Sequence, residues 1–141
     1  MEPKIVLTES AAQADREVIL RGLVGFNERH VGAANFKPLV LLLQHPPLET
    51  TVGGLWGRTA YDWCFVELLF VPEELRGRKL GRDLMMKAEE EARRRSCVGV
   101  FLDTFEFQAR GFYEKLGYAV FGELPDHPIG TRHFFMHKSL R

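Results

Sequence analysis

The stretch EELRGRKLGRDLMM, residues 73–86, places a cluster of cations and glycines immediately before a segment with helical periodicity. The clustered residues are Arg76, Gly77, Arg78, Lys79, Gly81 and Arg82. A helix N-terminus already carries about half a positive charge and normally favours acidic side chains. Unpaired N–H groups, glycines that admit a close approach, and cations together suit a polyanion such as pyrophosphate. The stretch therefore predicts a phosphate-binding turn, with a solvated basic turn as the alternative. A Walker-type loop is excluded, because neither GxxxxGKS nor GxxxxGKT occurs.

The composition is that of an ordinary folded protein. With 141 residues, of which 45% are hydrophobic, we expect a single domain over residues 1–141. The 19 basic and 19 acidic residues cancel, which argues against nucleic acid or an anionic membrane as a partner. Neither a signal peptide nor a membrane span of about 18 apolar residues is predicted. Cys64 and Cys97 lack metal or redox spacing, which favours buried, reduced thiols and a cytoplasmic location.

Hydrophobic periodicity predicts a mixed α/β fold with helices on the faces of one sheet. Strands are expected at residues 5–8, 38–45, 49–58, 61–71, 97–104, 118–124 and 132–140. Helices are expected over about residues 12–31, 78–95 and 108–116. The run 61–71 is apolar on both faces except at Glu67, which predicts a central strand covered on both sides. Acid-before-base pairs from Glu89 to Arg95 predict a polar outer face on the second helix.

The order of these elements and two motifs resemble the GNAT acetyltransferase superfamily over roughly residues 38–138. The basic turn matches that superfamily's acetyl-CoA loop, R/Q-x-x-G-x-G/A, at Arg76 and Gly81. Downstream, QARGFYEKLGYAVFGEL (108–124) matches the segment that carries the superfamily's tyrosine, here Tyr113. One position departs from the loop pattern, because Lys79 replaces the first glycine and either narrows the loop or pairs with a phosphate. The resemblance implies a mixed, mostly antiparallel twisted sheet of about six to seven strands with about four helices on both faces.

The resemblance also implies a chemistry. It implies an N-acetyltransferase that moves the acetyl group of acetyl-CoA, without a metal, to a primary amine of a small molecule or peptide. Attack would be direct, in a ternary complex, with the pantetheine arm between two strands that part near residue 70. The residues then expected to bind acetyl-CoA are Leu69, Phe70, Val71, Arg76, Gly77, Arg78, Lys79, Leu80, Gly81, Arg82 and Gln108. Tyr113 is the expected general acid for the departing CoA thiolate, with a core tyrosine as the alternative.

Glu67 is the expected general base, because burial inside an apolar strand would make its carboxylate a stronger base. A carboxylate that pairs with an arginine or faces water is the alternative. The histidines show no metal spacing, and His127 or His133 is a minor candidate for lining the substrate end. The resemblance implies that residues 26–38 and the final strands build the acceptor pocket.

Two other classes of function stay open at this point. One is a non-catalytic acyl-CoA-binding or regulatory module, and the other is an RNA-binding domain that uses the basic turn. Tyr113 favours an enzyme over the binding module, and the neutral charge balance argues against RNA. The resemblance is also compatible with a homodimer, and the acceptor amine is not readable from the sequence.

Overall fold

The computed structural model describes residues 1–47 and 49–141, which form two compact units, residues 1–34 and 35–141. The first unit contains helix α1 (Gln13–Val31), as the periodicity predicts. Residues 1–12 contain no strand, so the strand expected at 5–8 is wrong. A four-residue apolar run makes a strand only when a neighbouring strand pairs with it, and the sequence alone does not show such a partner. The expected single domain over residues 1–141 stays a prediction.

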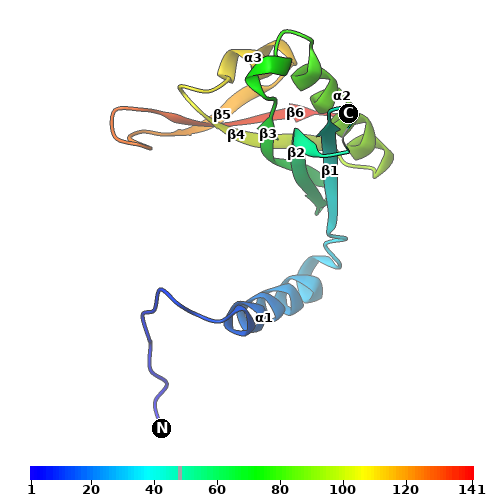
Figure 1. Ribbon diagram of the computed structural model, residues 1–141. Coiled ribbons are helices and arrows are strands. Elements are labelled where there is room, and N and C mark those ends of the chain that lie inside the picture. Colours follow the sequence, from blue (N-terminus) through cyan, green and yellow to red (C-terminus); the bar gives the residue numbers. More distant parts are fainter. Residues whose placement is uncertain (48) are drawn as a thin grey trace. The chain divides into compact units, whose positions relative to one another are not determined.

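The second unit is built on a six-stranded mixed sheet (Figure 1). Its strands are β1 (Lys37–Gln44), β2 (Thr51–Ala60), β3 (Trp63–Phe70), β4 (Gly99–Phe105), β5 (Ala119–Leu124) and β6 (His133–Ser139). They lie in the order β1-β2-β3-β4-β6-β5, with β3 and β4 parallel and the other neighbours antiparallel. The mixed, mostly antiparallel sheet expected from the sequence is therefore confirmed.

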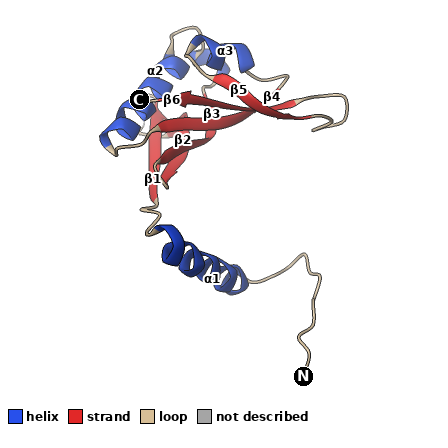
Figure 2. Cartoon of the chain, turned by 180° about the vertical axis from the view of Figure 1, so that it is seen from behind, coloured by secondary structure: helices blue, strands red, loops and turns tan. Residues whose placement is uncertain are grey.

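Two α-helices of this unit pack on one face of the sheet (Figure 2). They are α2 (Leu80–Arg94) and α3 (Arg110–Lys115), and a single 3₁₀ turn, η1 (Glu73–Leu75), precedes α2. With α1, the described residues hold three α-helices, one fewer than the four expected. Helix α2 lies across β1 to β4 and buries the predicted apolar stripe, which includes Leu84, Met85, Ala88 and Ala92.

The two faces of the sheet differ in chemistry, because alternate residues of a strand point to opposite sides. The face toward α2, here called the helix face, carries the buried core residues Cys64, Val66, Val100, Leu102, Phe134 and Met136. The opposite face, here called the aromatic face, carries Trp63, Phe65, Phe101, Phe121, Phe135 and His137, whose rings contact one another. The register therefore also places Asp103 and His133 on the aromatic face.

One buried ionic cluster ties α2 to the sheet. Glu89 is buried and accepts hydrogen bonds from the Tyr118 hydroxyl and the Lys138 ammonium, both at 2.8 Å. The expectation that Glu89 lies on the outer face is wrong, because it follows Met85 by four residues on the buried stripe. The pair of Glu91 and Arg95 does form, at 2.7 Å. The buried Glu89 carboxylate needs its two donors, Tyr118 and Lys138, to offset the cost of removing it from water.

Both cysteines are buried and free, as expected. Burial raises the pKa of the Cys64 thiol to about 12, so the thiol is protonated and unreactive at neutral pH. Among the residues that the structure describes, no helix has the length and hydropathy to cross a membrane.

Candidate active site

An opening forms where β3 and β4 part. The two strands pair from Trp63 opposite Gly99 to Val66 opposite Leu102, and both then continue without pairing to each other. The separation begins at a β-bulge, because Trp56 of β2 pairs with Leu68 whereas the next residue, Gly57, pairs with Val66. Glu67 is the extra residue, and an inserted residue bends its strand away from a neighbour. The backbone edge of residues 67–70 that faces β4 is therefore left without a strand partner.

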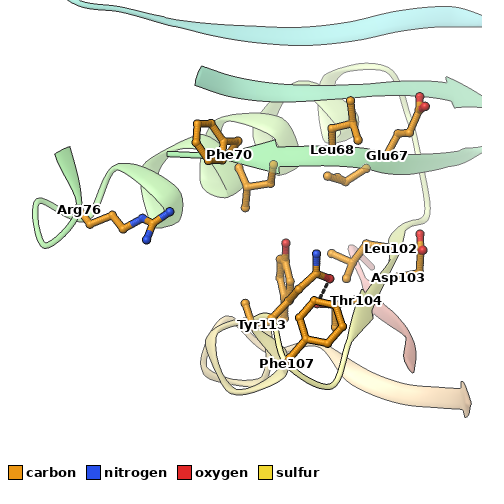
Figure 3. Close-up of a pocket in the computed structure, with 13 residues that line it drawn as sticks. Glu67, Leu68, Phe70, Arg76, Leu102, Asp103, Thr104, Phe107 and Tyr113 are labelled. Carbon is orange, nitrogen blue, oxygen red and sulfur yellow. Dashed lines mark hydrogen bonds between the residues drawn. The ribbon is translucent and has the colours of Figure 1, made fainter. Parts of the chain in front are cut away.

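A cavity of about 620 Å³ occupies this opening (Figure 3). Arg76 lies at one end of the cavity, Glu67 and Asp103 lie at the other, and Tyr113 projects between them from α3. The cavity is also lined by Val66, Leu68, Leu69, Phe70, Leu102, Thr104, Phe107, Gln108 and Ala109. An elongated ligand with an anionic end fits this distribution of charge.

The Tyr113 ring is buried while its hydroxyl points into the opening. The Tyr113 backbone N–H donates to Ala109 O at 3.2 Å, and the Tyr118 N–H donates to Tyr113 O at 3.0 Å. These two bonds hold the backbone from which the Tyr113 side chain projects. Within the described parts of the chain, the hydroxyl has no hydrogen-bond partner. Burial, and then the charge of Asp103, raise the pKa of Tyr113 to about 12. The residue is thus a protonated donor at neutral pH, free to bond to a ligand.

Gln108 belongs to the same wall. Its Oε1 accepts hydrogen bonds from the Phe105 N–H at 2.7 Å and from the Thr104 hydroxyl at 3.2 Å. These two bonds orient the amide group, whose nitrogen makes no hydrogen bond to another described residue. Gln108 therefore lines the cavity with N–H groups that no described residue occupies, and its expected role in cofactor binding stays a prediction.

A second cavity, of about 570 Å³, lies at the basic turn. It is lined by Val71, Leu75, Arg76, Gly77, Lys79, Leu80, Gly81, Arg82, Phe112, Lys115 and Leu116. Across residues 1–47 and 49–141, no backbone carbonyl accepts a hydrogen bond from the N–H groups of residues 77–82. Arg76 is oriented by a hydrogen bond from Nε to Val71 O at 3.0 Å. The turn thus presents unpaired donors and cations, as a phosphate site requires.

The backbone at Lys79 explains the departure from the loop pattern. Lys79 is the N-cap of α2 and has φ 61° and ψ 21°, the left-handed conformation that glycine adopts without cost. Lysine therefore takes a glycine conformation at this position and keeps the loop's path. Gly81, in the first turn of the helix, lies close to Phe112, because a Cβ there would be 3.3 Å from Cζ of that ring.

Most residues expected to bind acetyl-CoA gather around these two cavities. Leu69, Phe70, Arg76 and Gln108 line the first cavity, and Val71, Gly77, Lys79, Leu80, Gly81 and Arg82 join Arg76 in the second. Arg78 lines neither of them. Tyr113 lies in the first cavity, so the two sequence motifs meet at one opening.

Glu67 lies in the first cavity but is exposed, so the expectation of a buried carboxylate is wrong. The expectation that its strand is covered on both sides also fails beyond Val66, because Leu68 and Phe70 are 60% and 56% exposed. The bulge is the physical reason, since it moves the end of β3 out of regular pairing.

Asp103 was not among the predicted site residues, and the structure places it at the end of the same cavity. Its Oδ2 lies 2.8 Å from Nε2 of His133, a buried side chain whose Nδ1 has no partner among the described residues. His127 stacks on His133 with ring centroids 4.7 Å apart. A signal for Asp103 was present in the sequence, because it is the one carboxylate in β4, as Glu67 is in β3. No group of metal-binding side chains occurs in the described ranges.

Comparison with known proteins agrees with this arrangement. A family model described as the acetyltransferase (GNAT) family matches residues 9–118. The chain belongs to this family. The matched span contains the basic turn, the opening and Tyr113, and the resemblance proposed from the motifs is thereby confirmed.

Individual relatives cover much of the chain. It is 37% identical over 119 residues to acetyltransferase Atu2258 of Agrobacterium fabrum, which spans 84% of this chain and 86% of that protein. It is 39% identical over 89 residues to blasticidin-S acetyltransferase of Streptomyces morookaense, 62% of this chain and 65% of that one. A crystal structure from Agrobacterium tumefaciens, assigned as an acetyltransferase, superposes with a TM-score of 0.91 at 33% identity. That match covers 97% of this chain and 99% of the other.

Proposed function

We propose that this acetyltransferase uses acetyl-CoA to acetylate a primary amine of a small molecule or peptide, by direct attack in a ternary complex. The observation that carries the proposal is the opening between β3 and β4, which joins a cationic turn with free N–H groups to a cavity with a protonated tyrosine. The relative that is named for blasticidin S supports a small-molecule acceptor.

The residues around the opening fit acetyl-CoA at both ends. The N–H groups of residues 77–82, with Arg76, Lys79 and Arg82, suit the pyrophosphate. The unpaired edge of residues 67–70 suits an extended arm that carries amide groups, because it offers the backbone donors and acceptors of a missing strand. The thioester carbonyl then lies against strand N–H groups.

The reaction forms one C–N bond and breaks one C–S bond. The ammonium acceptor first loses a proton, and the free amine attacks the thioester carbonyl. Backbone N–H groups at the edge of β3 stabilise the resulting oxyanion, a contribution often worth about 3 kcal/mol per donor. As the C–S bond breaks, Tyr113 donates its proton to the thiolate. The net products are the amide, CoA thiol and one proton.

Thiol release from acetyl-CoA, measured with a panel of polyamines, amino acids, aminoglycosides and peptides, tests the proposal. Mass spectrometry of the product shows whether the acetyl group is on nitrogen. We expect thiol release that depends on both the protein and an amine. CoA binding without turnover on any amine would instead favour the acyl-CoA-binding module. The cytoplasmic location and the homodimer stay predictions.

A further inference from the structure

We propose that Asp103, positioned by His133, is the general base that removes the proton from the ammonium acceptor. The inference rests on the proposed function and assigns a residue to one step of it. Four features of the described residues support it: the face that Asp103 occupies, its anchorage, its neighbours and its access to the cavity.

The register of β4 places Asp103 and Tyr113 on opposite sides of the opening. Leu102 belongs to the buried core on the helix face, and strand alternation turns Asp103 to the aromatic face. Tyr113 comes from α3, which packs on the helix face. Both side chains nevertheless line one cavity, because β3 and β4 do not pair beyond Leu102. A thioester beside Tyr113 is therefore open to an amine that arrives on the side of Asp103.

His133 holds one oxygen of Asp103 and leaves the other free. The distance from Nε2 of His133 to Oδ2 of Asp103 is 2.8 Å, and the His133 side chain is only 5% exposed. A carboxylate only accepts hydrogen bonds, so Nε2 carries the proton and donates. Oδ1 accepts no hydrogen bond from another described residue, and the Asp103 side chain, which lines the cavity, is 32% exposed. That oxygen can accept the proton of a bound ammonium.

The His133 ring is enclosed by other aromatic rings, and its second nitrogen is buried. With the proton on Nε2, Nδ1 of His133 is a buried acceptor without a donor in the described residues. Such an atom forfeits its hydrogen bond to water, and in native structures it calls for an explanation. Phe105, Phe135 and His127 surround the ring at centroid distances of 4.3, 5.0 and 4.7 Å and prevent it from turning.

Asp103 is better suited to the step than Glu67. Both carboxylates line the same end of the cavity and attract a cation, but no described residue makes a hydrogen bond or ion pair with Glu67. A base needs a fixed position within hydrogen-bond reach of the proton that it removes. Asp103 has that fixed position. It also lies close enough to Tyr113 for its negative charge to contribute to the raised pKa of that tyrosine.

The proton balance closes with these two residues. Oδ1 of Asp103 takes a proton from the ammonium and later releases it to water through the cavity. The amine nitrogen forms the C–N bond, the C–S bond breaks, and the thiolate receives the Tyr113 proton. The second proton that leaves the nitrogen restores the Tyr113 phenol. One proton is released for each acetyl group transferred, which matches the overall reaction.

Two amines of similar size and different basicity test the assignment. Ethylamine is protonated at neutral pH, whereas 2,2,2-trifluoroethylamine is largely unprotonated and needs no base for its first deprotonation. For Asp103→Asn we expect kcat/KM to fall about 10²- to 10⁴-fold with ethylamine and less than about tenfold with the fluorinated amine. Asp62→Asn, at an exposed turn, is the matched control and should change neither value. Equal losses with both amines, or no loss, would overturn the assignment.

His133 has its own variants. His133→Gln keeps an N–H donor for Asp103, and we expect it to retain more activity toward ethylamine than His133→Phe, which has none. Toward the fluorinated amine the two variants should be similar. A purely structural role for His133 predicts equal losses with both amines, and that result would remove it as the positioning residue.

The pH dependence of kcat/KM for the unaltered chain tests the same assignment without any variant. The titratable groups around Asp103 are Glu67 from β3, Tyr113 from α3, His133 from β6 and His127 from the β5–β6 loop. With a base, kcat/KM for ethylamine stays nearly flat between about pH 7 and pH 9, because the ammonium is the substrate. Without a base, kcat/KM rises about tenfold per pH unit, because only the free amine reacts and its fraction rises in that way. Such a rise would contradict the inference.

Two further observations distinguish a failure of the base assignment from a failure of the proposed function. Acetyl-CoA should raise the melting temperature of Asp103→Asn as much as that of the unaltered chain, so a failure of the base assignment leaves the cofactor assignment standing. If the unaltered chain releases no thiol with either amine or with the acceptor panel, the proposed function fails and this inference fails with it.

Discussion

At the scale of single residues, Tyr113 is the proposed general acid. Its ring packs against Phe112 and Tyr118, with centroids 5.0 and 6.1 Å away, while its hydroxyl points into the cavity. Burial holds the proton on the oxygen, because the raised pKa of about 12 keeps the phenol neutral well above physiological pH. A neutral, fixed donor is what a departing thiolate needs.

Tyr113→Phe removes this donor and keeps the packing. We expect kcat to fall about 10- to 100-fold, the lower part of the usual range for acid catalysis, because a thiolate is already a good leaving group. The melting temperature and the acetyl-CoA dissociation constant should hardly change. Steady-state kinetics and calorimetry with the best acceptor of the panel measure these values. Full kcat in a folded variant would leave proton delivery to another group.

The raised pKa of Tyr113 also predicts a pH dependence of stability. Below about pH 10 the phenol is protonated in the folded and the unfolded chain, so its contribution is fully present. Above that pH the unfolded chain ionises first, and the free energy of unfolding falls as pH rises toward the folded pKa of about 12.

Tyr113→Phe should therefore reduce the alkaline loss of stability, as measured by urea unfolding at several values between about pH 9 and pH 11.5. The loss should not vanish, because burial also raises the pKa of Tyr118. Tyr61→Phe, at an exposed turn, is the control and should leave the slope unchanged. Identical slopes for Tyr113→Phe and the unaltered chain would contradict the burial of this hydroxyl.

Lys79 tests the loop at residue resolution. The left-handed backbone conformation costs an L-residue about 1–2 kcal/mol, a cost that is absent for glycine. A glycine at this position would therefore stabilise the folded chain, but part of this stabilisation is offset by the greater freedom of glycine in the unfolded chain. We expect Lys79→Gly to be more stable than Lys79→Ala by about 0.5–1 kcal/mol in urea unfolding.

The same two variants decide the role of the Lys79 ammonium. If the ammonium binds phosphate, both should bind acetyl-CoA more weakly than the unaltered chain and to a similar extent. We expect this result, because Lys79 lines the cavity at the turn. Unchanged affinity in both variants would assign lysine no part in binding and leave the phosphate to the backbone and the neighbouring arginines.

At the scale of elements, the site depends on the start of α2 and the end of β3. The helix begins at Leu80 directly after the cationic turn, and β3 leaves its parallel partner after Val66. The first element supplies unpaired N–H groups, and the second supplies an unpaired edge. Backbone geometry therefore contributes to the proposed binding of acetyl-CoA together with the cations of the turn.

Gly81→Asp should weaken acetyl-CoA binding by at least tenfold, because it adds bulk beside Phe112 and a negative charge where phosphate is expected. Arg94→Ala is the matched control, since it also lowers the net charge by one, but at the exposed C-terminal end of the same helix. Calorimetric titration of both folded variants compares them. Equal affinities would refute this placement of the pyrophosphate.

The sequence predicted elements better than contacts. The α2 stripe, the cationic turn and Tyr113 were readable because periodicity and motif spacing are local properties of the chain. The bulge at Glu67 was not, because it depends on the register between β2 and β3, which the pattern of either strand alone does not specify. For the same reason the burial of Glu67 was predicted wrongly, and the pair of Asp103 and His133, 30 residues apart, was missed.

At the scale of the whole molecule, positive and negative charges balance, but the cationic turn is locally basic. The net charge is zero, yet four cations lie within residues 76–82. A neutral protein exerts little long-range attraction on a polyanion, so binding relies on this local cluster and on the backbone donors beside it. The expected contribution of residues 26–38 to the acceptor pocket stays a prediction.

The central claim is that acetyl-CoA occupies the opening between β3 and β4 with its pyrophosphate at the start of α2. Amide NMR of the full ¹⁵N-labelled chain, titrated with acetyl-CoA and separately with ATP, tests it most directly. We predict that acetyl-CoA causes its largest amide shifts at residues 67–70 and 77–82, and that ATP shifts the second group alone. No shifts at millimolar acetyl-CoA, or shifts that spare both groups while others move, would contradict the claim.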